Sequence, residues 1–197
     1  MDKLTVSTYD QMVLEYDEET ADFWDRFPRI IIDKFADLVH GHVLDVGSGP
    51  GRDGLILQKK GLEVTCIDAS KAMVALSTSR GLKSVVGDFC ALPFPNESFS
   101  GVWAYTALLH VSRAEVGTAF SEIARVLKKR GIFGLGLIEG DEELYRESSG
   151  IGKSRWFSYY QKGEVEDLLK KYGFTIIQFD QFKPGSKNYL NFISSKN

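Results

Sequence analysis

The chain has 197 residues, enough for one well-buried domain and short for two, and its 43% hydrophobic and 26% charged residues are ordinary for a globular protein. The formal net charge of −3 argues against a surface that neutralises nucleic-acid phosphates, and no apolar run approaches the roughly 20 residues that cross a bilayer. The first residues lack a signal peptide's apolar stretch, and Cys66 and Cys90 lack the spacing of a metal site. We therefore expect one cytoplasmic domain over residues 1–197, with reduced thiols and with no metal, membrane or nucleic-acid partner.

Residues 1–28 and 139–160 show the least regular apolar patterning, and both segments place aromatic side chains beside charged ones. Segments of this kind often close over a ligand, and a substrate pocket is commonly apolar with few polar groups. An equally open interpretation is that they cover the edges of a sheet. Their candidate functional role is to cover a substrate.

Elsewhere, short apolar runs alternate with segments of helical period, which predicts a parallel sheet covered by helices on both faces. Strands are predicted over residues 42–46, 62–67, 83–86, 99–105, 132–138, 174–179 and 189–193. Helices are predicted from the glycine-rich turn after residue 46 to Gly61, from Ser70 to near Gly81, from Ser112 to Gly131, and over residues 164–172. Ser70 is expected to be an N-cap, and Ser112 with Glu115 a capping box.

The last two predicted strands are joined by a short turn at Pro184-Gly185. Such strands must pair antiparallel, because a parallel pair needs a long crossover. The sequence therefore predicts an α/β fold whose sheet is mostly parallel and includes a C-terminal antiparallel strand. A dinucleotide-binding fold would stay parallel at that edge.

The run from Val43 to Arg52 is an apolar strand with one acid, Asp45, followed by glycine at every second position. Each glycine removes a Cβ, so the backbone can approach a nucleoside-bearing ligand closely. Two interpretations compete. Gly49 to Gly54 matches the G-x-G-x-x-G dinucleotide pattern. Asp45 favours another ligand, since a buried carboxylate is costly without a cationic or donor partner and would repel a pyrophosphate.

The spacing Asp45-x-Gly47-x-Gly49-x-Gly51 resembles motif I of the class I S-adenosylmethionine (SAM) methyltransferases. Further segments fall in that family's order. They are Asp68 at the end of the second strand, Asp88-Phe89 after the third, Leu92 to Phe99, Trp103 to Val111, and Phe157 to Tyr160. The resemblance covers residues 40 to 180, with Asn96-Glu97 and Ser100 as departures from the family's L-P-F-x-D-x-S-F-D segment.

The resemblance implies a three-layer sandwich with a seven-stranded sheet in the order 3-2-1-4-5-7-6, SAM as cofactor and S-adenosylhomocysteine as product. In the family, the acid at Asp68 accepts hydrogen bonds from both ribose hydroxyls, the acid at Asp88 meets the adenine amino group, and the residue at Phe89 packs on the adenine ring. Arg52 is a candidate for the methionine carboxylate, and Tyr9 for closing over the methionine end. The implied cofactor residues are Tyr9, Asp45, Gly47, Ser48, Gly49, Gly51, Arg52, Asp68, Ala69, Asp88, Phe89, Ala104 and Tyr105.

Structural alternatives stay open for several of these residues. Asp68 would also suit a helix N-terminus, Asp88 the start of a turn, and Arg52 a solvated surface. His110 and Tyr105 are the candidates for a catalytic role. An unperturbed imidazole titrates near neutrality, whereas a histidine between a buried strand and a capped helix is more often hydrogen-bonded structure.

The resemblance also implies in-line displacement of an activated methyl group, for which the protein need supply no nucleophile. The Asn-Pro-Pro-Tyr motif that marks amino methylation of adenine or glutamine in the family is absent, so we hypothesise a small-molecule acceptor. Two other functions stay open. One is a nicotinamide-dependent oxidoreductase, supported only by Gly49 to Gly54 and Asp68, and the other is a non-catalytic SAM-binding module.

Overall fold

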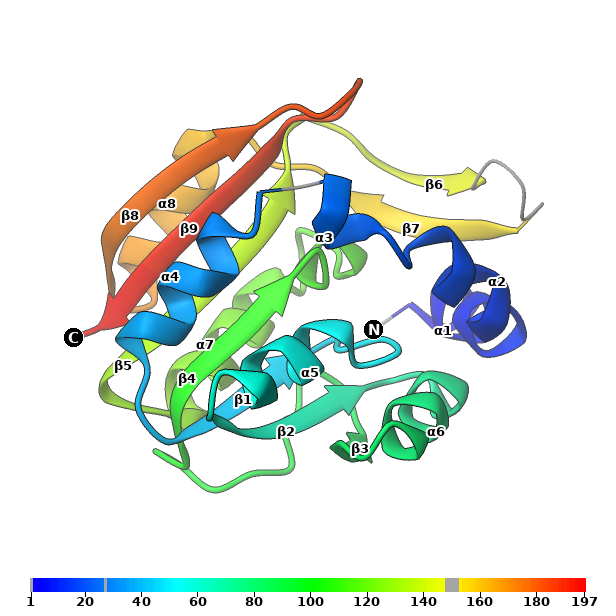
Figure 1. Cartoon of the computed structure of the whole chain (residues 1–197). Coiled ribbons are helices and arrows are strands. Elements are labelled where there is room, and N and C mark those ends of the chain that lie inside the picture. The colour runs from blue at the N-terminus through cyan, green and yellow to red at the C-terminus, as the bar shows by residue number, and fades with distance from the viewer. Residues whose placement is uncertain (1, 27, 148–152) are drawn as a thin grey trace.

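A seven-stranded sheet forms the middle layer of the molecule, with helices on both faces (Figure 1). The computed structural model describes residues 2–26, 28–147 and 153–197. The strands of this sheet are β1 His42–Val46, β2 Glu63–Asp68, β3 Lys83–Val86, β4 Phe99–Tyr105, β5 Leu127–Ile138, β8 Phe174–Phe182 and β9 Tyr189–Lys196. The helices are α1 Lys3–Gln11, α2 Val13–Glu19, α3 Phe23–Arg26, α4 Ile30–Leu38, α5 Arg52–Lys59, α6 Lys71–Ser79, α7 Val116–Val126 and α8 Lys162–Lys171, with a short 3-10 helix at Leu108–His110.

The strand order is β3-β2-β1-β4-β5-β9-β8. Strands β6 Glu143–Glu147 and β7 Ser154–Ser158 pair only with each other, so the order is the predicted 3-2-1-4-5-7-6 when the strands of the large sheet are counted alone. Strand β9 runs antiparallel to both of its neighbours, β5 and β8. The predicted α/β sandwich with a C-terminal antiparallel strand is confirmed.

Two apolar cores hold the layers together, one on each face of the sheet. Helices α4 and α5 cover the first face, where Ile32, Phe35 and Leu57 are fully buried. Helices α7 and α8 cover the second face through side chains such as Phe120 and Leu169. None of the described helices has both the length and the apolarity needed to cross a lipid bilayer.

The region around the start of α7 differs from the prediction. The helix begins at Val116 rather than at Ser112, because the Ser112 hydroxyl donates to the Glu115 carboxylate (2.9 Å) instead of accepting its amide. The predicted capping box there is therefore wrong. Gly131 does not end the helix either, since β5 starts at Leu127, whose register partner on β4 is Phe99.

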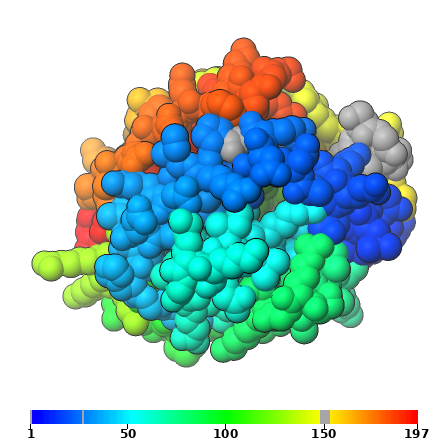
Figure 2. All heavy atoms as spheres, viewed as in Figure 1, coloured from blue at the N-terminus to red at the C-terminus, as the bar shows by residue number. Residues whose placement is uncertain are grey.

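The two segments of least regular sequence pattern fold into the helices α1 to α3 and the hairpin β6–β7. Asp2 caps α1 by accepting the Thr5 amide (2.8 Å). The hairpin packs on this helix, since the Thr8 hydroxyl donates to the Ser154 carbonyl (2.9 Å) and the Trp156 amide donates to the Thr5 hydroxyl (2.8 Å). The space-filling view shows the N-terminal residues lying across the front of the molecule, between the C-terminal strands and the helices α5 and α6 (Figure 2).

Candidate functional site

A cavity of about 320 Å³ lies where β1, β2 and β4 end. The turn from Gly47 to Pro50, Asp68 and the residues from Tyr105 to Ala107 line it from the sheet. Further lining residues come from the N-terminal helices, β7 and the β8–β9 turn. The carboxyl edge of a parallel sheet is where ligands bind in open α/β folds, so this is the candidate site.

The turn after β1 needs glycine at the positions that the sequence singled out. Gly47, Gly49 and Gly51 have φ of 66°, 51° and 83°, in the left-handed region that side chains disfavour. A Cβ at Gly47 would lie 2.4 Å from the Ala107 Cβ. At Gly49 the nearest atom, on Tyr16, would be 3.9 Å away, so the backbone there faces open space from which a ligand can approach.

Asp68 holds this turn against the end of β2. One carboxylate oxygen accepts the Gly49 amide (2.9 Å) and the other accepts the Ser70 amide (2.9 Å). Burial raises the pKa of Asp68, although these amides lower it. Each carboxylate oxygen accepts more than one hydrogen bond, so Asp68 keeps capacity for two hydroxyls of a ligand.

Asp45 and Asp53 add two more acids to the same cavity. Burial and the nearby Asp53 and Asp68 raise the pKa of Asp45 well above its ordinary value, and the Cys66 thiol donates to its carboxylate at 3.9 Å. Asp53 accepts hydrogen bonds from the indoles of Trp24 (2.5 Å) and Trp103 (2.7 Å), and burial raises its pKa. Two buried carboxylates and a half-buried one favour a ligand that carries positive charge.

His110 is fixed between the N-terminal helix and the hairpin. Its Nδ1 lies 2.6 Å from the Trp156 carbonyl, which only accepts, so this nitrogen carries the proton. Its Nε2 then accepts from the Tyr9 hydroxyl (2.8 Å), which itself accepts from Arg155 (2.8 Å). Burial lowers the pKa of His110 to about 3. A neutral imidazole with both nitrogens engaged fits the structural interpretation of His110 better than the catalytic one.

The other sequence-derived candidates divide into two groups. Residues that line the cavity are Tyr9, Asp45, Gly47, Ser48, Gly49, Arg52, Asp68, Phe89, Tyr105 and His110. Gly51, Ala69, Asp88 and Ala104 lie outside the lining. Asp88 accepts the Cys90 amide (2.9 Å), as a residue that starts a turn does.

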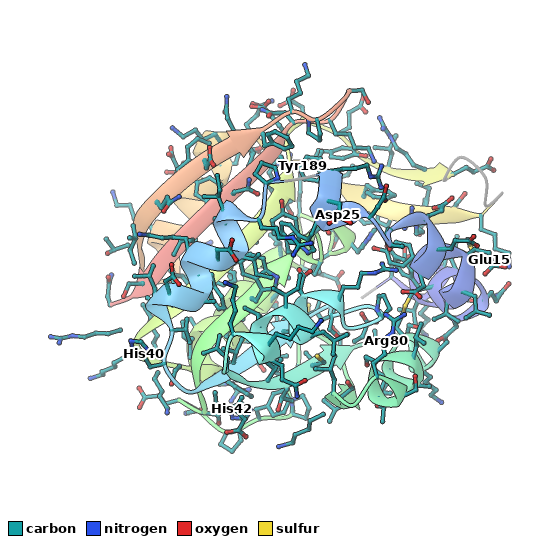
Figure 3. The ribbon with its side chains drawn as sticks, in the orientation of Figure 1. Glu15, Asp25, His40, His42, Arg80 and Tyr189 are labelled. Atoms are coloured by element: carbon teal, nitrogen blue, oxygen red, sulfur yellow. The ribbon has the colours of Figure 1, made fainter. Side chains whose placement is uncertain are left out.

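Arg52 reaches the N-terminal segment rather than a solvated surface. Its guanidinium pairs with the Asp17 carboxylate (2.5 Å) and also contacts the Asp17 carbonyl and the Thr20 hydroxyl. Arg80 extends from α6 to the same carboxylate (2.5 Å; labelled in Figure 3). Through these ion pairs to Asp17, both arginines hold α2 beside the glycine turn.

Several lining residues were missed at the sequence level. Asp53 follows Arg52 directly, but its two indole partners lie 29 and 50 positions away in the chain. Aromatic side chains form another wall of the cavity, and all but Tyr189 come from the two segments that the sequence analysis singled out for their aromatic residues. It consists of Tyr16, Phe23, Trp24, Phe157 and Tyr189, the last of which is labelled in Figure 3. Two cations, Arg155 and Lys187, line the cavity with it.

Comparison with known proteins gives matches to methyltransferases. Residues 44–135 match the family described as the methyltransferase domain. A sterol 24-C-methyltransferase of Gibberella zeae is 39% identical over 104 residues, which cover 47% of this chain and 26% of that protein. This chain thus spans about a quarter of the length of that curated relative.

Solved structures of methyltransferases share the fold of this chain. A SAM-dependent methyltransferase from Methanosarcina mazei superposes with a TM-score of 0.75 and 19% identity, covering 86% of this chain and 97% of that one. The 1,6-didemethyltoxoflavin N1-methyltransferase of Burkholderia thailandensis, with 1,6-didemethyltoxoflavin and S-adenosylhomocysteine bound, has a TM-score of 0.71 and 19% identity over 97% of this chain and 88% of that one.

Proposed function

We propose that this protein transfers a methyl group from SAM to a small-molecule acceptor. Residues 44–135 match the methyltransferase domain, and the chain has the fold of SAM-dependent methyltransferases, as its sequence predicts. The observation that carries the proposal is the pairing of the open glycine turn with Asp68. The backbone at Gly49 faces the cavity, and Asp68, bound to the Gly49 amide, presents two carboxylate oxygens beside it. This arrangement suits a nucleoside with a vicinal diol.

The acidic side chains that line the cavity favour SAM over a nicotinamide dinucleotide. SAM carries a sulfonium and an α-ammonium, and both are attracted by the buried acids Asp45 and Asp68 and by the half-buried Asp53. A pyrophosphate placed at the same turn would be repelled by these carboxylates, and its burial there would be costly. The C-terminal antiparallel strand β9 also favours SAM, because dinucleotide-binding sheets stay parallel at that edge.

When bound, SAM would supply a methyl group already activated by the sulfonium. The residues of this chain would then bind, orient and exclude water. Phe89 lies against the glycine turn, 3.2 Å from where a Cβ of Gly47 would lie, and suits an adenine ring. Tyr105 and the aromatic wall would hold the acceptor in line with the methyl group. Orientation of this kind lowers a barrier by roughly 7–11 kcal/mol without a protein nucleophile.

The size of the cavity and the segments that enclose it support a small methyl acceptor. The cavity of about 320 Å³ is lined on its outer side by α1 to α3 and by β7. The 1,6-didemethyltoxoflavin bound in the Burkholderia structure is a small molecule. We assign residues 1–28 and 139–160, as far as they are described, the role of covering the acceptor.

Calorimetric titration with S-adenosylhomocysteine and with NAD tests this proposal. We expect saturable binding of S-adenosylhomocysteine and none of NAD. The opposite result would replace the proposal with a nicotinamide-dependent function. Binding of S-adenosylhomocysteine without methyl transfer to any member of a broad acceptor screen, together with a SAM effect on a partner's binding, would favour a non-catalytic SAM-binding module.

A further inference from the structure

Thr106 follows β4 directly, in a backbone conformation that its side chain disfavours. Its φ is 53°, in the left-handed region, which makes a β-branched residue a clear outlier. Glu97 and Arg130 also have positive φ in the described part of the chain, but they lie outside the cavity lining, whereas Thr106 is part of it. Such strain persists only where the surroundings fix it, and it is concentrated at functional sites.

Contacts on both sides hold Thr106 in this conformation. Its amide donates to the Gly136 carbonyl on β5 (2.9 Å), and the preceding residue, Tyr105, is buried at the end of β4. The following residue, Ala107, lies against the glycine turn, since a Cβ at Gly47 would be 2.4 Å from the Ala107 Cβ. Thr106 therefore lies where β4 meets the turn at which the cofactor is proposed to bind.

The Thr106 side chain is the part of this turn that is open to the cavity. Every other residue of 101–111 is buried, whereas Thr106 is half-buried and lines the cavity. No described residue forms a hydrogen bond with its hydroxyl. By contrast, the hydroxyl of Thr20, another lining residue, donates to the Tyr16 carbonyl (2.7 Å). The Thr106 hydroxyl can therefore both donate to and accept from a ligand.

Aromatic rings gather beside Thr106. The ring centre of its neighbour Tyr105 lies 5.9 Å from that of Phe23 and 5.1 Å from that of Trp24, and all three residues line the cavity. Phe23 and Trp24 belong to α3, which lies near the end of β4 (Figure 1). A pocket of this kind packs a flat apolar body and orients it through a few placed polar groups.

We propose that the Thr106 hydroxyl binds a neutral hydroxyl or amino group on an aromatic methyl acceptor and determines which acceptors the site takes. Such a group both donates and accepts, as the threonine hydroxyl does. The inference deepens the proposed function and rests on it, because Ala107 places Thr106 beside the glycine turn assigned to SAM. A site that hydrogen-bonds a group of its substrate rejects an analogue without that group.

The test uses the full chain saturated with S-adenosylhomocysteine and three probes of similar size: phenol, aniline and toluene. Ligand-observed NMR measures their affinities. The ratio of the affinity for phenol or aniline to that for toluene removes the contribution of the ring. The larger of the two ratios identifies the group that the site prefers.

Three variants show whether this ratio depends on the Thr106 hydroxyl. Thr106→Val keeps the branched shape and should lower the larger ratio about threefold to tenfold, as expected for the loss of one net hydrogen bond. It should leave the affinity for S-adenosylhomocysteine unchanged. Thr106→Ser keeps the hydroxyl and should keep the ratio. Thr118→Val is the matched control, because Thr118 is exposed on α7 and lies outside the cavity lining.

The strain at Thr106 is tested without any ligand. Thr106→Gly and Thr106→Ala both lack the hydroxyl and the methyl group, but only glycine adopts positive φ without steric cost. We therefore expect the glycine variant to unfold at a higher urea concentration than the alanine variant. An alanine variant of equal or greater stability would show that the backbone is not held in the left-handed region, and would overturn the inference.

Three binding results would also overturn it: a wild-type protein that binds neither phenol nor aniline, an unchanged ratio in Thr106→Val, or a loss of S-adenosylhomocysteine affinity in that variant, which would assign the hydroxyl to the cofactor. Failure of wild-type protein to bind S-adenosylhomocysteine would instead contradict the proposed function itself. The cofactor titration, performed first, distinguishes the two failures.

Discussion

Asp68 joins two parts of the candidate cofactor site, because a single carboxylate holds the Gly49 amide and the Ser70 amide. We expect Asp68→Ala to weaken S-adenosylhomocysteine by about 1.5–3 kcal/mol, the usual value of hydrogen bonds to a charged group. Calorimetric titration measures the loss, and Asp37→Ala, an exposed acid on α4, is the control. An unchanged affinity in Asp68→Ala would remove this residue from the site.

We expect the Asp45 carboxylate to lower the stability of the ligand-free protein and to strengthen cofactor binding. Its pKa is raised above the ordinary 3.8 in the folded protein, so its contribution to stability is full below about pH 3.8 and is lost as the pH rises through the folded pKa. Asp45→Asn should therefore stabilise the ligand-free protein at pH 7 and weaken S-adenosylhomocysteine. Urea unfolding and calorimetry measure the two effects. A variant that is less stable at pH 7 would contradict this account of the buried acids.

His110 should make the protein sensitive to mild acid. Its pKa is about 3 in the folded state against an ordinary 6.5, so the unfolded state binds more protons between these values. The stability it supports is present above pH 6.5 and falls as the pH drops below that value, by up to about 1.4 kcal/mol per pH unit.

The comparison for His110 is with His110→Gln, unfolded in urea at pH 7, 6 and 5. We expect the stability advantage of the wild type over the variant to shrink as the pH falls. A constant difference across the three pH values would show that the imidazole titrates alike in both states, as an exposed general base would.

The contact between α1 and β7 joins two segments that are far apart in the chain. The Thr8 hydroxyl is buried and donates to the Ser154 carbonyl at 2.9 Å. Thr8→Val keeps the shape but leaves that carbonyl without its donor, and should lower the free energy of unfolding by about 1–3 kcal/mol. Ser7→Ala, on the exposed side of α1, should change it little. Equal effects of the two variants in urea unfolding would contradict the expected role of this contact.

The strands of the large sheet could be predicted because each is a short apolar run between turn signals. Strands β1, β3 and β4 have the predicted bounds, and β2 differs by one residue at each end. Helices α1 to α4 and the hairpin β6–β7 could not be located, since their apolar faces are completed by other segments rather than by a regular period. The early start of β5 is a tertiary effect as well, because Leu127 is fixed by pairing with Phe99.

At the scale of the whole molecule, the cavity brings together residues from Tyr9 to Tyr189. Local motifs identified the part of the lining that lies in the βα turns, such as Gly47, Gly49 and Asp68, because those turns are continuous in sequence. They gave no signal that Asp53 and Lys187 line the cavity, because this depends on how distant segments fold over the sheet.

The central claim is that a nucleoside with a methionine side arm occupies this edge of the sheet. A crystal structure of the protein grown with S-adenosylhomocysteine tests it most directly. We expect both ribose hydroxyls within hydrogen-bond distance of the Asp68 carboxylate and the amino acid end beside the turn from Gly47 to Gly49. Electron density that places the compound elsewhere, or crystals in which the cavity stays without it at saturating concentration, would contradict the account.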